Sequence, residues 1–276
     1  MRPKGNSPAD NVRFTVCVLL YGDYPHLARR CLHSIWDSLA VGESSISEFR
    51  LGLNEISPAT RSVVTWFIDQ ATGKLQLPVT RYECPKNACK YPLMRRMLRG
   101  NEPVATSHVM WFDDDSYLTD GPLWWKQVSA AASSAAMLGK LYYQRVIGQQ
   151  WLWVKKQPWY NHRAGRCKIN GSHIFRFCTG GWWVLRSDVL SRYDWPTREL
   201  RHRGGDALLG ELLRHQDLWM QNFERGVRIN ADIHGRHSKS PRRGVDERQL
   251  GQRLSDLERP PCHDFECDVI ATTSRR

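Results

Sequence analysis

An apolar run from Val109 to Phe112 ends in three consecutive carboxylates, Asp113 to Asp115, and this feature most constrains the chain. An apolar run of this kind predicts a buried strand. Three like charges at its exit repel one another unless a cation neutralises them. Hard divalent cations such as Mg2+ and Mn2+ prefer oxygen ligands and often bridge substrate phosphates. The alternative is a solvated acidic turn, because Ser116 and the turn residues Asp120-Gly121-Pro122 follow.

The order of predicted elements favours an α/β fold with a mostly parallel central sheet flanked by helices. Strands that alternate with helices at short spacing are typical of such a sheet. Its ligands bind beyond the carboxyl ends of the strands, where the triple aspartate lies. Hydrophobic spacing predicts strands at 14–20, 49–54, 78–82, 108–113 and 136–143, and helices at 25–39, 57–72, 91–98 and 123–135.

The second half is less regular. Residues 144–173 have the composition of a basic, aromatic insertion, and 174–185 predict two strands joined by a turn at Gly180-Gly181. A helix is expected from Asp206 to His215, and another around Leu250 to Leu257. We therefore expect a disordered lead at 1–12, one domain at 13–235 with halves at 13–120 and 121–235, and a basic loop, helix and loose tail at 236–276.

The charge is strongly basic and unevenly spread. The chain of 276 residues carries 40 basic and 28 acidic residues, a net charge of +12. From Gly121 to Ser187 there is no acidic residue, while ten basic residues alternate with aromatic ones. Basic charge mixed with aromatic faces suits a polyanion that carries stackable bases, such as double-stranded DNA. The alternative is a generally basic surface over ordinary core aromatics.

Location and thiol state follow from what the sequence lacks. The polar start shows no signal peptide, and no apolar stretch is long enough for a transmembrane segment. We expect a cytoplasmic protein, in the host cytoplasm if it is viral, with reduced thiols. Eight cysteines include two C-x4-C pairs, Cys84/Cys89 and Cys262/Cys267, which are either a zinc site or plain thiols.

Four motifs occur in a characteristic order. A D-x-D pattern at Asp113 and Asp115 precedes Gly180-Gly181-Trp182-Trp183, then Gly204-Gly205-Asp206, then a late histidine. In this order residues 14–237 resemble the GT-A glycosyltransferases, most closely the family 2 type. The resemblance implies a Rossmann-like fold with a nucleotide-sugar half and a basic, aromatic-rich acceptor half. It also implies transfer of a sugar from a donor such as UDP-glucose, with Mn2+ or Mg2+ as cofactor.

The resemblance also assigns donor and metal residues. Asp113 would approach the ribose or the metal with Asp114 beside it, and Asp115 would coordinate the metal. A late histidine, His234 with His237 in reserve, would complete the metal shell. The uridine would lie against Tyr21, Asp23, Asn54 and Glu55.

Basic residues after the third strand have two interpretations. Lys90, with Lys86, Arg95 and Arg96, either binds the diphosphate or an anionic acceptor, or lies on a solvated helix face.

The acceptor side carries the implied catalytic base. Asp206 matches the acid that acts as general base in inverting members of the family. A positioned carboxylate can take the proton of an attacking hydroxyl, but a helix N-cap is the plain alternative. One acid stands where the family usually has Glu-Asp, so a retaining mechanism stays open. The residues expected to border the acceptor are Gly180, Gly181, Trp182, Trp183, Arg201 and Arg203.

Three functions remain open. The first is transfer of a sugar to a hydroxymethylated pyrimidine in DNA, such as 5-hydroxymethylcytosine, as phage DNA-modifying glucosyltransferases do. The second is glycosyl transfer to a surface polysaccharide or a lipid-linked glycan, with the basic face on anionic membrane. The third is a non-catalytic nucleic-acid-binding protein on a GT-A scaffold, which the intact D-x-D pattern opposes.

Overall fold

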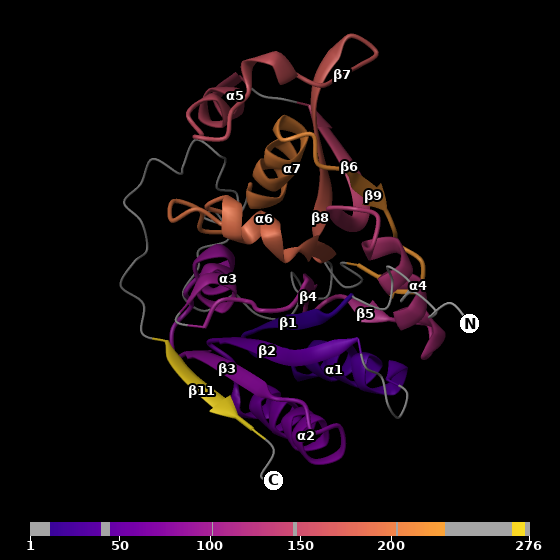
Figure 1. Cartoon of the computed structure of the whole chain (residues 1–276). Coiled ribbons are helices and arrows are strands. Elements are labelled where there is room, and N and C mark those ends of the chain that lie inside the picture. Colours follow the sequence, from indigo (N-terminus) through magenta and orange to yellow (C-terminus); the bar gives the residue numbers. More distant parts are fainter. Residues whose placement is uncertain are drawn as a thin grey trace, which may run out of the picture.

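The computed structural model describes residues 12–39, 45–100, 102–145, 148–202, 204–229 and 267–273. Their main feature is a central sheet with the strand order β11-β3-β2-β1-β4-β8-β6-β9 (Figure 1). The strands are β1 (Phe14–Tyr21), β2 (Ile46–Asn54), β3 (Val79–Cys84), β4 (His108–Asp113), β6 (Met137–Arg145), β8 (Ser172–Arg186), β9 (Met220–Asn222) and β11 (Asp268–Thr272).

The first half of the sheet is parallel. β3, β2, β1 and β4 run in the same direction, joined by α1 (Pro25–Ser38), α2 (Pro58–Lys74) and α3 (Lys90–Arg99). Strand β1 is buried along nearly its whole length, as expected for a parallel strand with helices on both faces. The predicted α/β fold is therefore confirmed, and the triple aspartate lies at the carboxyl end of β4.

The second half of the sheet changes direction at β8, which runs antiparallel to both β4 and β6. The predicted turn at Gly180-Gly181 is wrong, because β8 continues through both glycines. The glycines immediately precede Trp182, the first residue of β8 that is paired with β4, and they lie beside a register shift in the pairing with β6. Glycines inside a strand often mark such bulges, so the pair marks an irregularity of a long strand.

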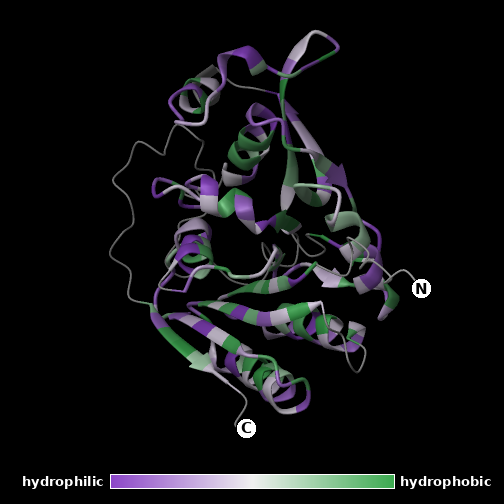
Figure 2. Ribbon diagram, in the orientation of Figure 1, coloured by the Kyte–Doolittle hydropathy of each residue, from purple (hydrophilic) through white to green (hydrophobic). Residues whose placement is uncertain are grey.

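Helices cover both faces of the sheet and form two cores. One core contains α1, α2 and α4 (Leu123–Ala132), and the other contains α3, α6 (Ser187–Arg192) and α7 (Gly205–His215). Figure 2 shows hydrophobic residues along β8 and α7, which meet in the second core. Trp182 and Trp183 are almost fully buried, one in each core, because successive strand side chains point to opposite faces. Their burial contradicts the expectation that they border the acceptor.

The C-terminal segment differs from the expected loose tail. Residues 268–272 form β11, which pairs antiparallel with β3 and covers the edge of the sheet. An uncovered edge strand would expose unpaired backbone groups, so this pairing protects β3. The lead up to residue 11 and the predicted basic loop and helix of the C-terminal region lie outside the described residues.

The predicted insertion forms an arm, defined here as residues 140–176, at one end of the molecule (Figure 1). It contains α5 (Gly148–Lys155), a 3-10 turn (His162–Ala164) and β7 (Lys168–Ile169), which pairs with β8. Among its described Phe, Tyr and Trp residues, three are buried (Trp151, Trp159 and Phe175), two are half-buried (Trp153 and Tyr160) and two are exposed (Tyr142 and Tyr143). The expected interleaving of basic and aromatic side chains on one surface is therefore only partly present. Two short strands, β5 (Tyr117–Leu118) and β10 (Val227–Arg228), pair apart from the main sheet.

Across these described ranges, no helix combines the length and the apolar character that a bilayer crossing requires.

Candidate active site at the carboxyl end of β4

Lys90 joins the end of β4 to the glycine pair in β8. Its Nζ donates to Asp113 Oδ2 at 2.6 Å and to the Gly180 carbonyl oxygen at 2.8 Å. The other Asp113 oxygen accepts a hydrogen bond of 2.9 Å from Trp111 Nε1. The side chains of Lys90 and Asp113 are only 12% and 19% exposed. Both Asp113 oxygens and the Lys90 ammonium therefore already have partners inside the protein.

Several nearby carboxylates stabilise the protonated, positively charged form of Lys90. Burial alone would lower the pKa of Lys90, but Asp113 and Asp206 raise it more, with a smaller contribution from Asp115. The pKa of Lys90 therefore lies above its ordinary value, and the residue is a cation at neutral pH. Lys90 therefore does not lie on a solvated helix face, which was the alternative interpretation.

Asp206 lies in the first turn of α7, where the N-cap is Gly204 with a φ of +85°. No side chain caps this helix end, so the N-cap interpretation of Asp206 is wrong. Its Oδ1 instead accepts a hydrogen bond of 2.6 Å from the hydroxyl of Tyr91, in the first turn of α3. The adjacent residues Lys90 and Tyr91 thus hold two carboxylates from distant parts of the chain.

The environment of Asp206 suits proton transfer. Burial raises its pKa most strongly, and Asp113 raises it further, while Lys90 and the Tyr91 hydrogen bond lower it. The net result is a pKa above the usual aspartate value. A carboxylate whose pKa moves towards the working pH is a better general base, provided that it is still ionised.

Two glycines make this arrangement sterically possible. A Cβ on Gly180 would lie 2.6 Å from Asp206 Oδ2, and a Cβ on Gly205 would lie 2.3 Å from the Tyr91 ring. Both distances are far below van der Waals contact. Gly180 therefore has a different role from the predicted acceptor contact, because it leaves room for the carboxylate of Asp206.

Substitution of Gly180 tests this packing. We expect Gly180→Ala to displace Asp206 and to destabilise the fold by about 1–3 kcal/mol, the usual cost of overpacking. Gly121→Ala is the matched control, since a Cβ there meets nothing within 4 Å. Urea unfolding of both variants measures the difference. Equal stability of the two variants would show that Asp206 does not need the space at Gly180.

Asp114 and Asp115 are both buried at this strand exit. Asp114 Oδ2 accepts a hydrogen bond from the Tyr21 amide at 3.1 Å, and its own amide donates to the Leu19 carbonyl at 3.1 Å. Asp114 therefore fastens the end of β1 to the end of β4. Asp115 is 6% exposed and lies two residues beyond Asp113 at the strand exit.

The carboxylates at this exit fit a divalent cation. All are oxygen donors, which Mg2+ and Mn2+ prefer, and Mg2+ usually takes one or two carboxylates plus substrate phosphates. No cluster of three candidate metal-ligating side chains occurs among the described residues. Lys90 and Trp111 both engage the Asp113 carboxylate, and the expected coordination of the metal by Asp115 stays a prediction. The predicted ligand His234, with its reserve His237, lies outside the described residues.

The residues expected around the uridine shape the loops near the site. Asn54 is buried, and its side chain donates to Asn87 Oδ1 at 3.0 Å and accepts from the Ala88 amide at 2.8 Å. These bonds fix the loop that leads from β3 into Lys90. Asp23 is exposed, and Tyr21 and Glu55 are half-buried at the same ends of β1 and β2.

The other predicted site residues are dispersed. The Arg201 carbonyl accepts a hydrogen bond of 2.9 Å from the Tyr91 amide, so the backbone of Arg201 supports α3. Arg203 lies outside the described residues. Arg95 pairs with Asp194 at 2.6 Å, and Arg96 donates to the Cys267 carbonyl at 3.4 Å, so both guanidinium groups have partners inside the protein.

Tyr91 is the functional candidate that the sequence does not reveal. It lies 115 residues before Asp206, and no spacing rule connects the two positions. Its hydroxyl is buried, and a buried tyrosine next to a lysine at a helix start is an ordinary core pattern. Only the packing of α3 against α7 makes the contact visible.

Comparisons with known proteins address the fold. No family model matches the sequence, and neither does any curated protein. Among solved structures, the mannosyltransferase PcManGT from Pyrobaculum calidifontis, in complex with GDP-Man and Mn2+, is similar with a TM-score of 0.53 and 14% identity over 79% of this chain. GalNAc-T7, with UDP, GalNAc and Mn2+, gives a TM-score of 0.57 and 10% identity over 86% of this chain.

These likenesses establish the GT-A glycosyltransferase fold for this chain. The chain spans about half the length of the two proteins, 56% of the first and 46% of the second.

Proposed function

We propose that this protein is a metal-dependent glycosyltransferase that moves a sugar from a nucleotide sugar to an acceptor hydroxyl. The observation that carries this proposal is the arrangement of Asp113 and Asp206 around Lys90 and Tyr91, beside the carboxyl end of β4. In open α/β sheets this end of the strands is the place where ligands bind. Two similar structures with the same fold contain Mn2+ with GDP-Man or with UDP and GalNAc, which supports the same class of donor here.

Each group has a role in the proposed reaction. Asp206 takes the proton of the acceptor hydroxyl as it attacks the anomeric carbon. Lys90 bonds to both Asp113 and the Gly180 carbonyl, so it fixes the distance between the end of β4 and the middle of β8. Asp115 would hold Mn2+ or Mg2+. When bound, such a cation stabilises the negative charge that develops on the diphosphate leaving group.

Tyr91→Phe tests the role of Asp206 through a pH profile. Removing the hydroxyl removes a hydrogen bond that lowers the pKa of Asp206, so this pKa rises. A general base works when deprotonated, and the rising limb of kcat/KM therefore moves to higher pH. Tyr193→Phe is the control, because it removes a similar hydrogen bond, to Gln216, away from the site. An unmoved limb in Tyr91→Phe would argue against Asp206 as the base.

The arm supports a polyanionic acceptor, and we propose hydroxymethylated pyrimidine in double-stranded DNA. Among the arm's described basic residues, Lys140, Arg145, Lys155, Arg163, Arg166 and Lys168 are exposed. The arm has no acidic residue at all, and Lys140 pairs with Glu224 from outside it. Phosphate contacts by such side chains supply sequence-independent affinity for DNA. The exposed rings of Tyr142 and Tyr143 can stack on a base that has been flipped out of the duplex.

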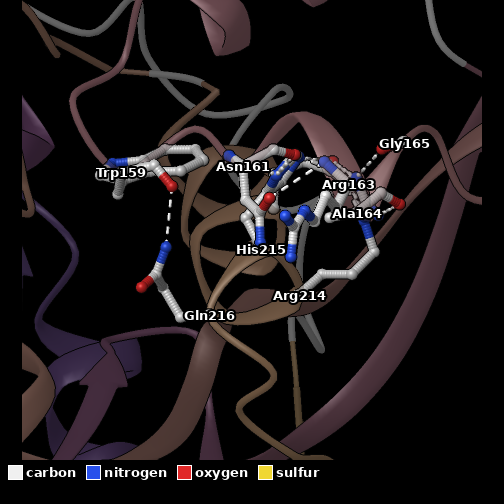
Figure 3. A network of polar contacts seen from close by, with 9 residues as sticks. Trp159, Asn161, Arg163, Ala164, Gly165, Arg214, His215 and Gln216 are labelled. Carbon is white, nitrogen blue, oxygen red and sulfur yellow. Dashed lines mark hydrogen bonds and ion pairs between the residues drawn. The ribbon is translucent and has the colours of Figure 1, made fainter.

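A buried polar network holds the arm against the helix that carries Asp206 (Figure 3). Arg214 bonds to the carbonyls of Ala164 and Gly165 at 2.9 and 2.7 Å and pairs with the fully buried Glu211 at 2.6 Å. His215 Nδ1 lies 3.0 Å from the Asn161 carbonyl oxygen. This anchor is nine residues from Asp206 along α7, about 14 Å at 1.5 Å per residue. One duplex can therefore contact both the arm and the proposed base.

DNA binding is expected to depend steeply on salt and on the arm. Removing one lysine that neutralises a phosphate lowers the slope of log K against log salt by about 0.9. The double variant Lys155→Ala/Lys168→Ala should therefore lower the slope by about 2, whereas Lys74→Ala, on α2 at the far side of the sheet, should leave it unchanged. Fluorescence anisotropy with hydroxymethylated DNA measures both. Binding that is insensitive to salt and to these variants would favour the glycan acceptor instead.

A further inference from the structure

Two cysteines that are far apart in sequence face each other across β3 and β11. The antiparallel register pairs Asp268 with Glu83, so the preceding Cys267 lies opposite Cys84. Directly opposed residues of such a pair have Cα atoms about 4.5–5.5 Å apart, inside the range of about 4.4–6.8 Å that disulfides use. Neither thiol forms a disulfide, and the Cys267 thiol donates to the Asp268 carbonyl oxygen at 3.9 Å. The C-x4-C partner Cys89 is not the residue that Cys84 faces.

The two thiols differ in access and in acidity. Cys84 is buried, while Cys267 is half-exposed. Interaction with the Cys84 thiol and with the nearby Arg96 guanidinium lowers the pKa of Cys267. Interaction with the Cys267 thiol, together with burial, raises the pKa of Cys84. An accessible, acidic thiol beside a buried, protonated one is the usual arrangement of an attacking and a resolving cysteine.

We propose that Cys267 and Cys84 form a redox site that a small-molecule disulfide, such as oxidised glutathione, converts into a Cys84–Cys267 disulfide. The Cys267 thiolate attacks one sulfur of the oxidised glutathione and releases one glutathione thiolate. Cys84 then loses its proton and attacks the Cys267 sulfur of the mixed disulfide, which releases the second glutathione. Two protein thiols are oxidised, and one small disulfide is reduced to two thiols.

The link would fasten β11 covalently to the edge of the sheet. The five residues of β11 are held to β3 by strand pairing. The Cys84 carbonyl also accepts a hydrogen bond of 2.9 Å from the Glu55 amide, at the point where the loop towards Lys90 begins. The thiol pair therefore lies at the base of the loop that leads into the candidate site. The proposal is independent of the transfer reaction, and its test needs no activity.

The test uses the full-length folded protein and oxidised glutathione. After native incubation, we expect denaturing thiol titration to fall from eight to six thiols per chain, a loss of two. Mass spectrometry of a non-reduced digest should show the peptides of Cys84 and Cys267 joined. Cys84→Ser should stop at a glutathione adduct on Cys267, Cys267→Ser should form neither product, and Cys89→Ser should behave as wild type.

Three results would overturn the proposal: a lasting glutathione adduct on wild-type Cys267, a disulfide from Cys267 to another cysteine, or no reaction at either thiol. Circular dichroism checks that each variant is folded. Cys84→Ala replaces Cys84→Ser if the buried hydroxyl prevents folding, and the wild-type result decides the question in either case.

Discussion

Asp206→Asn should lower kcat of sugar transfer by about 10² to 10⁴-fold, the usual contribution of a general base. Asparagine keeps the size of the side chain and can still accept the hydrogen bond from Tyr91, which is 2.6 Å long in the structure. It cannot take a proton from the acceptor. The Michaelis constant for the donor should change little, because the proposed donor position is on the β4 side of Lys90. Steady-state kinetics with a saturating donor measures the effect.

Asp194→Asn is the matched control for this loss. Asp194 is half-exposed and pairs with Arg95 at 2.6 Å away from the site, so its removal should leave kcat unchanged. If Asp206→Asn and Asp194→Asn have the same kcat as wild type, Asp206 is not the base. A retaining mechanism, which needs no base at this position, would then become the better account.

Asp115→Ala should abolish the metal dependence of donor binding and lower kcat/KM by about 10² to 10³-fold. A cation at the diphosphate supplies several kcal/mol of stabilisation to the developing charge, and each 1.36 kcal/mol corresponds to about tenfold in rate. Isothermal titration of the nucleotide sugar, with and without Mn2+, measures the binding directly. We expect Mn2+ to tighten binding to the wild type and to have no effect on the variant.

Asp114→Asn is the control that separates metal binding by Asp115 from the general effect of removing a buried carboxylate. Asp114 is as deeply buried as Asp115, but its carboxylate bonds to the Tyr21 amide inside the fold. Asparagine can still accept the hydrogen bond from the Tyr21 amide, so this variant should stay folded and leave the Mn2+ effect in place. If both variants lose the Mn2+ effect equally, the loss reflects damage to the end of β4. If neither loses it, the cation is not held by Asp115.

The parallel half of the fold could be predicted because its signals are local. The apolar run before Asp113 and the helical spacing after Pro25 each lie within one element, and the structure confirms β4 and α1. The predictions failed where pairing with a strand distant in sequence determines the local structure. Gly180-Gly181 has the composition of a turn, yet pairing with β4 and β6 carries the strand past it. Strand β11 depends on an edge that only the folded sheet presents.

The acidic residues of the candidate site could be picked out from the sequence, but the groups that form hydrogen bonds with them could not. Asp113, Asp115 and Asp206 belong to short motifs, whereas Tyr91 belongs to none. The contact between Lys90 and Asp113 also depends on how α3 packs against the sheet. The adjacent tryptophans Trp182 and Trp183 have the composition of a binding surface, and they are buried because helices cover both faces of β8.

The central claim is that a sugar leaves a nucleotide donor at this site and reaches a hydroxyl on DNA. The most direct test incubates the protein with Mn2+, a panel of nucleotide sugars and DNA containing 5-hydroxymethylcytosine, followed by mass spectrometry of the nucleosides. We predict a mass gain of one sugar on the modified base, which is lost in Asp206→Asn and Asp115→Ala. Release of the nucleoside diphosphate without a mass gain on any base would contradict the DNA acceptor. The absence of both products with every donor would contradict the glycosyltransferase function itself.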